Sequence, residues 1–144
     1  MKAAHPYLNF AGNAEEAFDF YKSVFGGEFA TLVRYKYFGG EEAGVSADDL
    51  DKIAHVALPV GETLLMASDV PSSRLSEHTV GSNVYISLTP DSADEAERVF
   101  DGLARGGIAE MPLQRTEWAE KYGSCIDKFG VRWMVSYRGN VSFG

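Results

Sequence analysis

The sequence predicts an α+β fold made of two tandem βαβββ modules. The first observation is an internal repeat: residues 6–27 and 85–106 each show an apolar strand, a turn, an amphipathic helix and a glycine stop. The second is that the helices align without a gap, through the pairs Ala14/Ala93, Glu16/Glu95, Ala17/Ala96, Phe20/Val99, Tyr21/Phe100, Val24/Leu103 and Gly27/Gly106. We interpret the repeat as one duplicated module rather than a solenoid, and expect function between or within the copies.

Composition and charge limit the possible partners. The chain has 144 residues, 45% hydrophobic and 24% charged, as is typical of one globular domain. Its formal net charge is −8, so we expect neither nucleic acid nor an anionic membrane as partner. No apolar run reaches the roughly 20 residues of a membrane span, and the N-terminus does not resemble a secretion signal. The single Cys125 cannot form an internal disulfide, so we expect a cytoplasmic protein.

The first copy begins with a predicted strand at residues 5–10 and a helix at residues 14–25. Asn13 is placed to cap the helix, and glycines end it. Aromatic and β-branched residues predict strands at 29–38, 52–60 and 63–68. The segment 39–51 is expected to be a solvated loop, and its acidic residues are Glu41, Glu42, Asp48, Asp49 and Asp51.

The second copy repeats this order after a polar connection. Strands are predicted at 83–88, 109–116, 122–127 and 131–137, and a helix at 93–105. Ser92 is placed to cap this helix, with Glu95 three residues later as in a capping box.

Alternation along the strands predicts which side of each sheet meets the helix. The side chains expected to pack on the helices are Leu8, Phe10, Val84, Ile86 and Leu88. Those expected on the other, concave side are His5, Tyr7, Asn9, Asn83, Tyr85 and Ser87. Two concave sides can close into a half-barrel with a central cavity.

Three stretches that together cover nearly the whole chain carry a family resemblance: PYLNFAGNAEEAFDFYKSVFGGE, AHVALPVGETLLMASD and EWAEKYGSCIDKFGVRWMVS. They resemble the vicinal oxygen chelate superfamily of glyoxalase I, extradiol dioxygenases and fosfomycin- and bleomycin-resistance proteins, and within it the PhnB-like branch. The resemblance implies a single glyoxalase-like domain over residues 1–144 with a cupped antiparallel sheet, its modules at about 4–69 and 83–138. It also implies a homodimer. Some members carry a methyltransferase label, but without a glycine-rich nucleotide loop we do not expect methyl transfer.

The resemblance also raises the question of a metal. Metal-using members hold a divalent ion with four inward side chains, mostly His and Glu, from the first and last strands of each module. The corresponding positions in this chain are Pro6 or Tyr7, Ala67, Tyr85 and Met134. Because these side chains cannot replace His and Glu, we predict no family-type metal site and no cofactor. A rebuilt site using His5, His55 or Asp69 is the alternative.

Candidate ligand-binding residues are those expected around the cavity: Tyr7, His55, Tyr85, Trp118, Tyr122 and Met134. His55 is the candidate catalytic residue, as a general base or a substrate hydrogen-bond partner; otherwise it is a partly buried histidine with satisfied nitrogens. The phenols of Tyr7 and Tyr85 either orient a ligand or fill the space of the missing metal. Trp118 and Tyr122 either wall a pocket mouth or plug the end of the barrel.

Five further residues are expected to be structural. We expect Trp133 in the core, Cys125 as a buried and inert thiol, and His78 in a surface loop. Asp69 and Asp127 are expected in turn or cap roles.

Three functions are compatible with these observations. The first, which we favour, is a metal-free protein that binds a small, partly aromatic or hydrophobic molecule. The second is a metal-dependent enzyme of glyoxalase or dioxygenase type. The third is a metal-free enzyme that uses His55 as its base.

Overall fold

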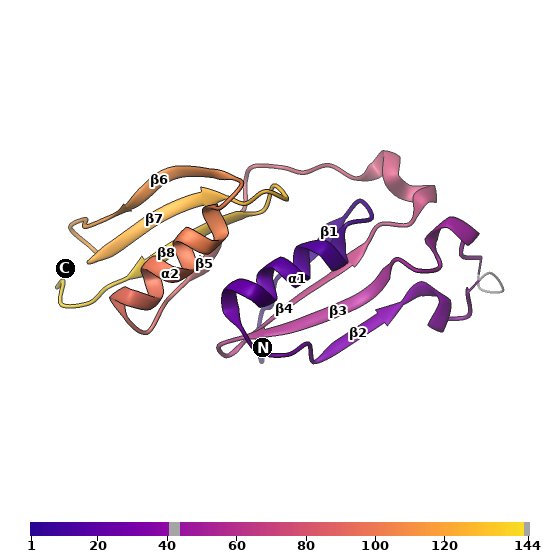
Figure 1. The fold of residues 1–144 in the computed structure, drawn as a ribbon, viewed down its shortest axis with the longest axis horizontal. Coiled ribbons are helices and arrows are strands. Elements are labelled where there is room, and N and C mark those ends of the chain that lie inside the picture. The colour runs from indigo at the N-terminus through magenta and orange to yellow at the C-terminus, as the bar shows by residue number, and fades with distance from the viewer. Residues whose placement is uncertain (41–43, 143–144) are drawn as a thin grey trace. The chain divides into compact units, whose positions relative to one another are not determined.

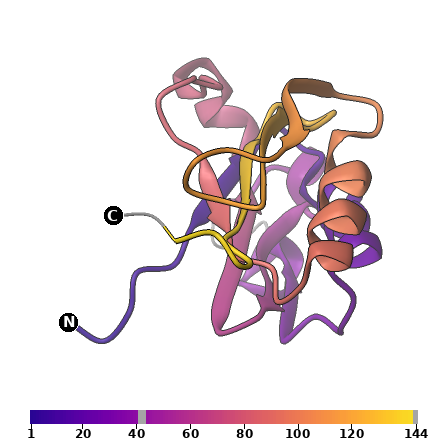
Figure 2. The same cartoon turned by 90° about the vertical axis from the view of Figure 1, so that its left-hand side faces the viewer.

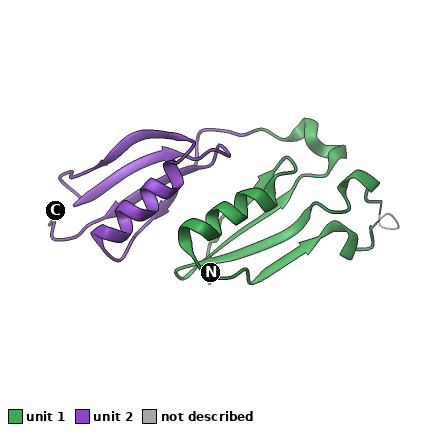
Figure 3. Cartoon of the chain, in the orientation of Figure 1, with its two compact units in different colours: residues 1–79 green, residues 80–144 purple. Residues whose placement is uncertain are grey.

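A computed structural model describes residues 1–40 and 44–142 of the chain. The chain divides into two compact units, residues 1–79 and 80–144, and each contains one copy of the repeat (Figure 3). Each unit is a four-stranded sheet with one long helix, so the predicted α+β fold of two βαβββ modules is confirmed. Within the described ranges, no helix is long and apolar enough to cross a membrane.

Unit 1 is a sheet with the strand order β1-β4-β3-β2, covered on one side by α1 (Figure 1). Its main elements are β1 (Tyr7–Phe10), α1 (Ala14–Phe25), β2 (Thr31–Arg34), β3 (Ile53–Val60) and β4 (Thr63–Asp69). Among its described residues are also the short 3-10 segments η1 (Tyr35–Tyr37), η3 (Ala47–Asp49) and η4 (Ser72–Glu77).

Unit 2 repeats this plan with the strand order β5-β8-β7-β6. Its elements are β5 (Ile86–Leu88), α2 (Ala93–Ala104), β6 (Ile108–Gln114), β7 (Lys121–Ile126) and β8 (Arg132–Tyr137). Figure 2 shows α2 on one side of the strands of this unit.

The sheets are antiparallel except at one pair each, where β1 runs parallel to β4 and β5 runs parallel to β8. The connection through the helix explains this pair. A helix returns the chain to the end of the sheet where the first strand began, so β1 and β2 run in the same direction. Two antiparallel steps, from β2 to β3 and from β3 to β4, restore that direction in β4.

The core of each unit lies between its helix and the facing side of its sheet. In unit 1 the buried residues include Ala17, Phe18, Tyr21, Val56, Leu58, Leu65 and Ala67. In unit 2 they include Ala96, Val99, Phe100, Leu103, Cys125, Trp133 and Val135. The predictions of a core Trp133 and a buried Cys125 are confirmed, and burial raises the pKa of the Cys125 thiol to about 12.

Several sequence expectations are corrected by the structure. The strand expected at 29–38 ends at Arg34, where η1 begins. Val84 does not pack on α2: it is 68% exposed, because β5 pairs with β8 only from Ile86 to Leu88. Ala67 is buried toward α1, so it cannot contribute to a site on the concave side.

The acidic segment is only partly a solvated loop. Asp48 and Asp51 are exposed, but Asp49 is buried at the end of η3. Glu41 and Glu42 lie outside the described residues.

The two helices begin in different ways. Ser92 Oγ accepts a hydrogen bond from Glu95 N (3.1 Å) at the start of α2, as predicted. The predicted Asn13 cap is wrong: among the described residues its side chain caps no amide of α1. Asp69 Oδ1, from the end of β4, accepts from Ala14 N (2.9 Å) instead, which confirms a cap role for Asp69.

Candidate functional site

The open face of unit 1, which we define as the side of its sheet opposite α1, carries half-exposed polar and aromatic side chains. The strand register places Tyr7 directly opposite Met66, and Asn9 opposite Ser68. Residues opposite each other in neighbouring strands project to the same face. Tyr7, Asn9, Met66 and Ser68 therefore form two adjacent rows on this face.

Tyr7 and His55 form a direct pair on the open face. Tyr7 Oη lies 3.1 Å from His55 Nδ1, and the two rings stack with centroids 5.6 Å apart and planes at 24°. His55 is partly buried. Because Nδ1 is engaged by the phenol, Nε2 is the ring nitrogen left for contact with a ligand.

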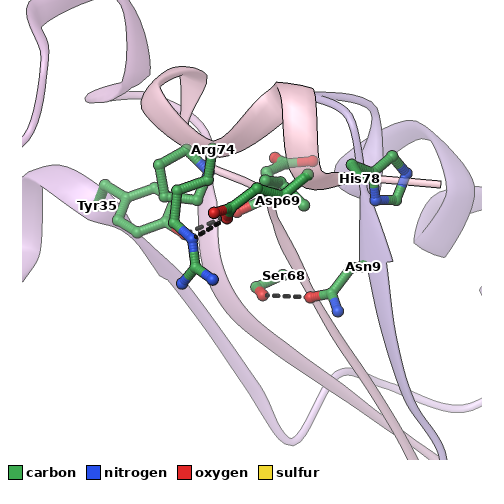
Figure 4. Close-up of a pocket in the computed structure, with 9 residues that line it drawn as sticks. Asn9, Tyr35, Ser68, Asp69, Arg74 and His78 are labelled. Atoms are coloured by element: carbon green, nitrogen blue, oxygen red, sulfur yellow. Dashed lines mark hydrogen bonds and ion pairs between the residues drawn. The ribbon is translucent and has the colours of Figure 1, made fainter.

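A pocket of about 380 Å³ lies at the end of this face, where β1 and β4 finish (Figure 4). Asn9 and Ser68 line it from the strands, and Ser68 Oγ donates a hydrogen bond to Asn9 Oδ1 (3.4 Å). Arg74 and His78 line it from η4 and the residue that follows η4. The sequence predicts Asn9 on this face but does not predict the pocket, and it places His78 only in a surface loop.

Buried polar contacts fix the wall of the pocket. Asp49 accepts from Ser72 Oγ (2.6 Å), Ser72 N (3.0 Å) and Lys52 Nζ (2.7 Å), so it ties η3 to the first residue of η4. The bonds from Lys52 and Ser72 lower the pKa of Asp49 to about 2. On the other side, Tyr35 Oη donates to the carbonyl oxygen of Asp69 (2.6 Å), and burial raises the pKa of Tyr35.

Three of the predicted ligand-binding residues come together in unit 2. The rings of Trp118 and Tyr122 meet edge to face, with centroids 5.3 Å apart, and Tyr122 Oη lies 3.3 Å from Met134 Sδ. Thr116 Oγ1 accepts from Ala119 N (3.1 Å) and from Trp118 N (3.3 Å), which holds the turn that carries Trp118. Trp118 remains 44% exposed, so this aromatic cluster presents a fixed surface.

Tyr85 joins a different group of unit 2. Its hydroxyl donates to Glu110 Oε1 (2.7 Å) and accepts from Arg132 Nη1 (3.2 Å), and Arg132 also pairs with Glu110 (3.3 Å). The Tyr85 hydroxyl is therefore hydrogen-bonded to both members of the Glu110–Arg132 ion pair. This pair gives Tyr85 a structural partner that its position in the sequence did not indicate.

The residues present do not fit the family-type metal site. The positions implied by the resemblance hold a phenol at Tyr7 and Tyr85, a thioether at Met134 and a buried methyl group at Ala67. Through the described ranges, no group of three or more His, Cys, Asp or Glu is placed to hold a metal ion.

The alternative ligands are not brought together either. Asp69 is 1% exposed, and its carboxylate accepts from Gly12 N, Ala14 N and Ile53 N. His5 Nδ1 accepts from Leu64 N (3.1 Å), at the other end of β1 from the pocket.

Comparisons with known proteins agree with this fold. The sequence profile of the Glyoxalase/Bleomycin resistance protein/Dioxygenase superfamily matches residues 4–135. Protein YjdN of Escherichia coli (strain K12) is 33% identical over 143 residues, which cover 91% of this chain and 92% of that protein.

Solved structures extend the comparison. Protein PA1353 from Pseudomonas aeruginosa is 38% identical, with a TM-score of 0.79 over 96% of this chain and 98% of that one. A PhnB protein from Bacillus cereus, described as a putative 3-demethylubiquinone-9 3-methyltransferase, is 27% identical, with a TM-score of 0.75 over 95% and 99%. The fosfomycin resistance protein FosX from Listeria monocytogenes shares the fold at 10% identity, with a TM-score of 0.64 over 93% and 91%. The chain belongs to the glyoxalase/bleomycin resistance/dioxygenase superfamily, with PhnB-like relatives.

Proposed function

We propose that this chain is a small-molecule-binding protein that works without a family-type metal and takes its ligand on the open face of unit 1. The observation that carries the proposal is continuity: the Tyr7–His55 pair lies next to the row of Asn9 and Ser68, which lines the pocket. Known ligand pockets measure about 300–1,000 Å³ and combine apolar walls with a few polar groups. The pocket, at about 380 Å³, suits a small ligand.

Each part of the face has a distinct task in this proposal. The stacked rings of Tyr7 and His55, with Met66 in the same row as Tyr7, offer a surface for an aromatic or hydrophobic part of the ligand. The amide of Asn9 and the hydroxyl of Ser68 can each donate and accept hydrogen bonds, so they can orient a polar group. We propose separately that the aromatic cluster of Trp118, Tyr122 and Met134, within unit 2, can contact an aromatic group of a ligand.

The histidines provide a direct test by NMR. The chain has three: His55 and His78 report on the face and the pocket, whereas His5 lies at the other end of β1. We expect a library of small aromatic acids, amides and alcohols to contain compounds that shift the ring signals of His55 and His78 and leave those of His5 unchanged. Ser68→Ala should weaken these compounds several-fold, because it removes a hydrogen bond in the pocket, about 1 kcal/mol.

The control for this test is Ser23→Ala, an exposed serine of α1 on the opposite side of the sheet. It should leave binding unchanged. The proposal fails if no compound class shifts His55 or His78, or if Ser68→Ala and Ser23→Ala bind alike. One zinc, nickel, iron or manganese per chain in protein purified without chelator would overturn the metal-free part.

The Tyr7–His55 contact also favours a second function, in which His55 acts as a general base. The direction of the Tyr7–His55 hydrogen bond decides whether His55 can act as a base. If Nδ1–H donates to Tyr7 Oη, Nε2 carries a lone pair and can accept a proton; if the phenol donates, Nε2 carries the proton and can only donate. Nitrogen-15 chemical shifts of the His55 ring at neutral pH distinguish the two tautomers, and a protonated Nε2 would rule out the base.

We also propose that the chain is a cytoplasmic homodimer and that its two units form one domain. The superfamily relatives and the single, buried Cys125 support this proposal.

A further inference from the structure

We infer that the ligand of the unit 1 pocket carries a carboxylate, which binds Arg74 in place of Glu77. This inference rests on the proposed function and narrows it to a ligand class. It starts from the charges around the pocket. Among the lining residues of the pocket, Arg74 is the one with a permanent positive charge. Asn9 and Ser68, which line the pocket from the strands, are neutral.

Arg74 is paired with Glu77 in an exposed ion pair, which is a weak interaction. Glu77 Oε2 accepts from Arg74 Nε (2.7 Å), three residues along the short η4 segment. The side chains are 70% and 63% exposed. Ion pairs this exposed contribute little to stability, because water screens both charges. A competing carboxylate can therefore displace Glu77 at low cost.

The other acidic residue of the lining does not compete for Arg74. The two carboxylate oxygens of Asp69 accept from backbone amides of Gly12, Ala14 and Ile53. These amides include the first turn of α1, where the helix dipole favours a negative charge. Glu77 is thus the carboxylate that occupies Arg74 when the pocket is empty.

The geometry of a guanidinium explains why a carboxylate is the preferred ligand group. Its planar N–H donors form two parallel bonds with one carboxylate, a match that a neutral amide cannot reproduce. The strand side of the pocket then receives the rest of the ligand at Asn9 and Ser68 (Figure 4).

Benzoate and benzamide, which share shape but differ in charge, test this inference. We would titrate each at constant ionic strength and follow the ring signals of His78. Wild type should bind benzoate about fivefold tighter than benzamide, the equivalent of one exposed charge pair. Arg74→Met should abolish the difference. Glu77→Gln should tighten benzoate by about threefold and leave benzamide unchanged, because it removes the competing carboxylate.

The matched control is Arg98→Met. Arg98 pairs with Glu95 at the same spacing on α2 of unit 2, so the variant changes the net charge equally without touching the pocket. It should bind benzoate as wild type does. Equal binding of benzoate and benzamide would overturn the carboxylate inference and leave the proposed function standing. If neither compound nor any library member shifts the ring signals of His78, both the carboxylate inference and the proposed function are contradicted.

Discussion

At the scale of single residues, Asp49 shows how an acid in a charged loop becomes a structural residue. Its side chain is 3% exposed and accepts three hydrogen bonds, two from Ser72 and one from Lys52. These contacts need the ionised carboxylate, which is why the pKa falls to about 2 from the ordinary value of 3.8. A pKa that is lower in the folded than in the unfolded chain makes stability depend on pH.

The first prediction concerns this dependence. The contribution of Asp49 should be complete above pH 4, decrease as the pH falls from there, and vanish below about pH 2. At neutral pH, Asp49→Asn should lower the free energy of unfolding by about 1–2 kcal/mol, an amount reduced by the partial exposure of Lys52. Urea denaturation from pH 7 to pH 2 measures it. Asp48→Asn, at an exposed residue, is the control. The prediction is contradicted if the free energies of unfolding of wild type and Asp49→Asn differ by the same amount at every pH.

At the scale of elements, the two helices start with different caps although their sequences align. In α2 the cap is local, from Ser92 to Glu95 N. In α1 it is remote, from Asp69 at the end of β4 to Ala14 N, and the same carboxylate bonds Ile53 N at the start of β3. Asp69 therefore joins a helix to two strands, whereas Ser92 stabilises only its own helix.

The second prediction follows from this difference. Ser92→Ala should lower the free energy of unfolding by about 1 kcal/mol, the usual cost of a lost cap. Asp69→Asn should cost about 3 kcal/mol, because an amide group then faces backbone donors that need an acceptor. Asn13→Ala should change stability least, since Asn13 is not the cap. Urea denaturation followed by circular dichroism measures all three, and an Asn13→Ala loss equal to that of Ser92→Ala would contradict the assignment.

The elements also show what the sequence could predict. Helices and the β3–β4 hairpin follow from apolar periodicity and glycine stops, and α1 spans Ala14–Phe25 as expected. The distant partners of Asp69 and Asp49 could not be predicted, because Ala14 and Ser72 lie 55 and 23 residues away from them. The side of the pocket formed by Arg74 and His78 could not be predicted for a related reason. The polar residues of η4 show no periodic pattern, and only tertiary contacts place Arg74 and His78 beside Asn9 and Ser68.

At the scale of the molecule, each unit leaves apolar side chains uncovered. In unit 1, Tyr7 on the open face is 46% exposed. In unit 2, Ile108 and Met111 on the edge strand β6 are 60% and 40% exposed. Soluble monomers rarely leave extended apolar surfaces and open strand edges in water. A second copy of the chain would cover the edge at β6 symmetrically, whereas the open face of unit 1 is proposed to receive the ligand.

The last prediction is the oligomeric state and its dependence on β6. Sedimentation equilibrium at micromolar concentration should give twice the monomer mass. A double variant, Ile108→Lys with Met111→Lys, should sediment as a monomer, because two charges on an edge strand oppose pairing with another chain. Tyr37→Lys, at a residue of unit 1 that is 71% exposed, is the control and should remain dimeric. A wild type that sediments as a monomer would contradict the homodimer, whereas a dimeric double variant would place the interface away from β6.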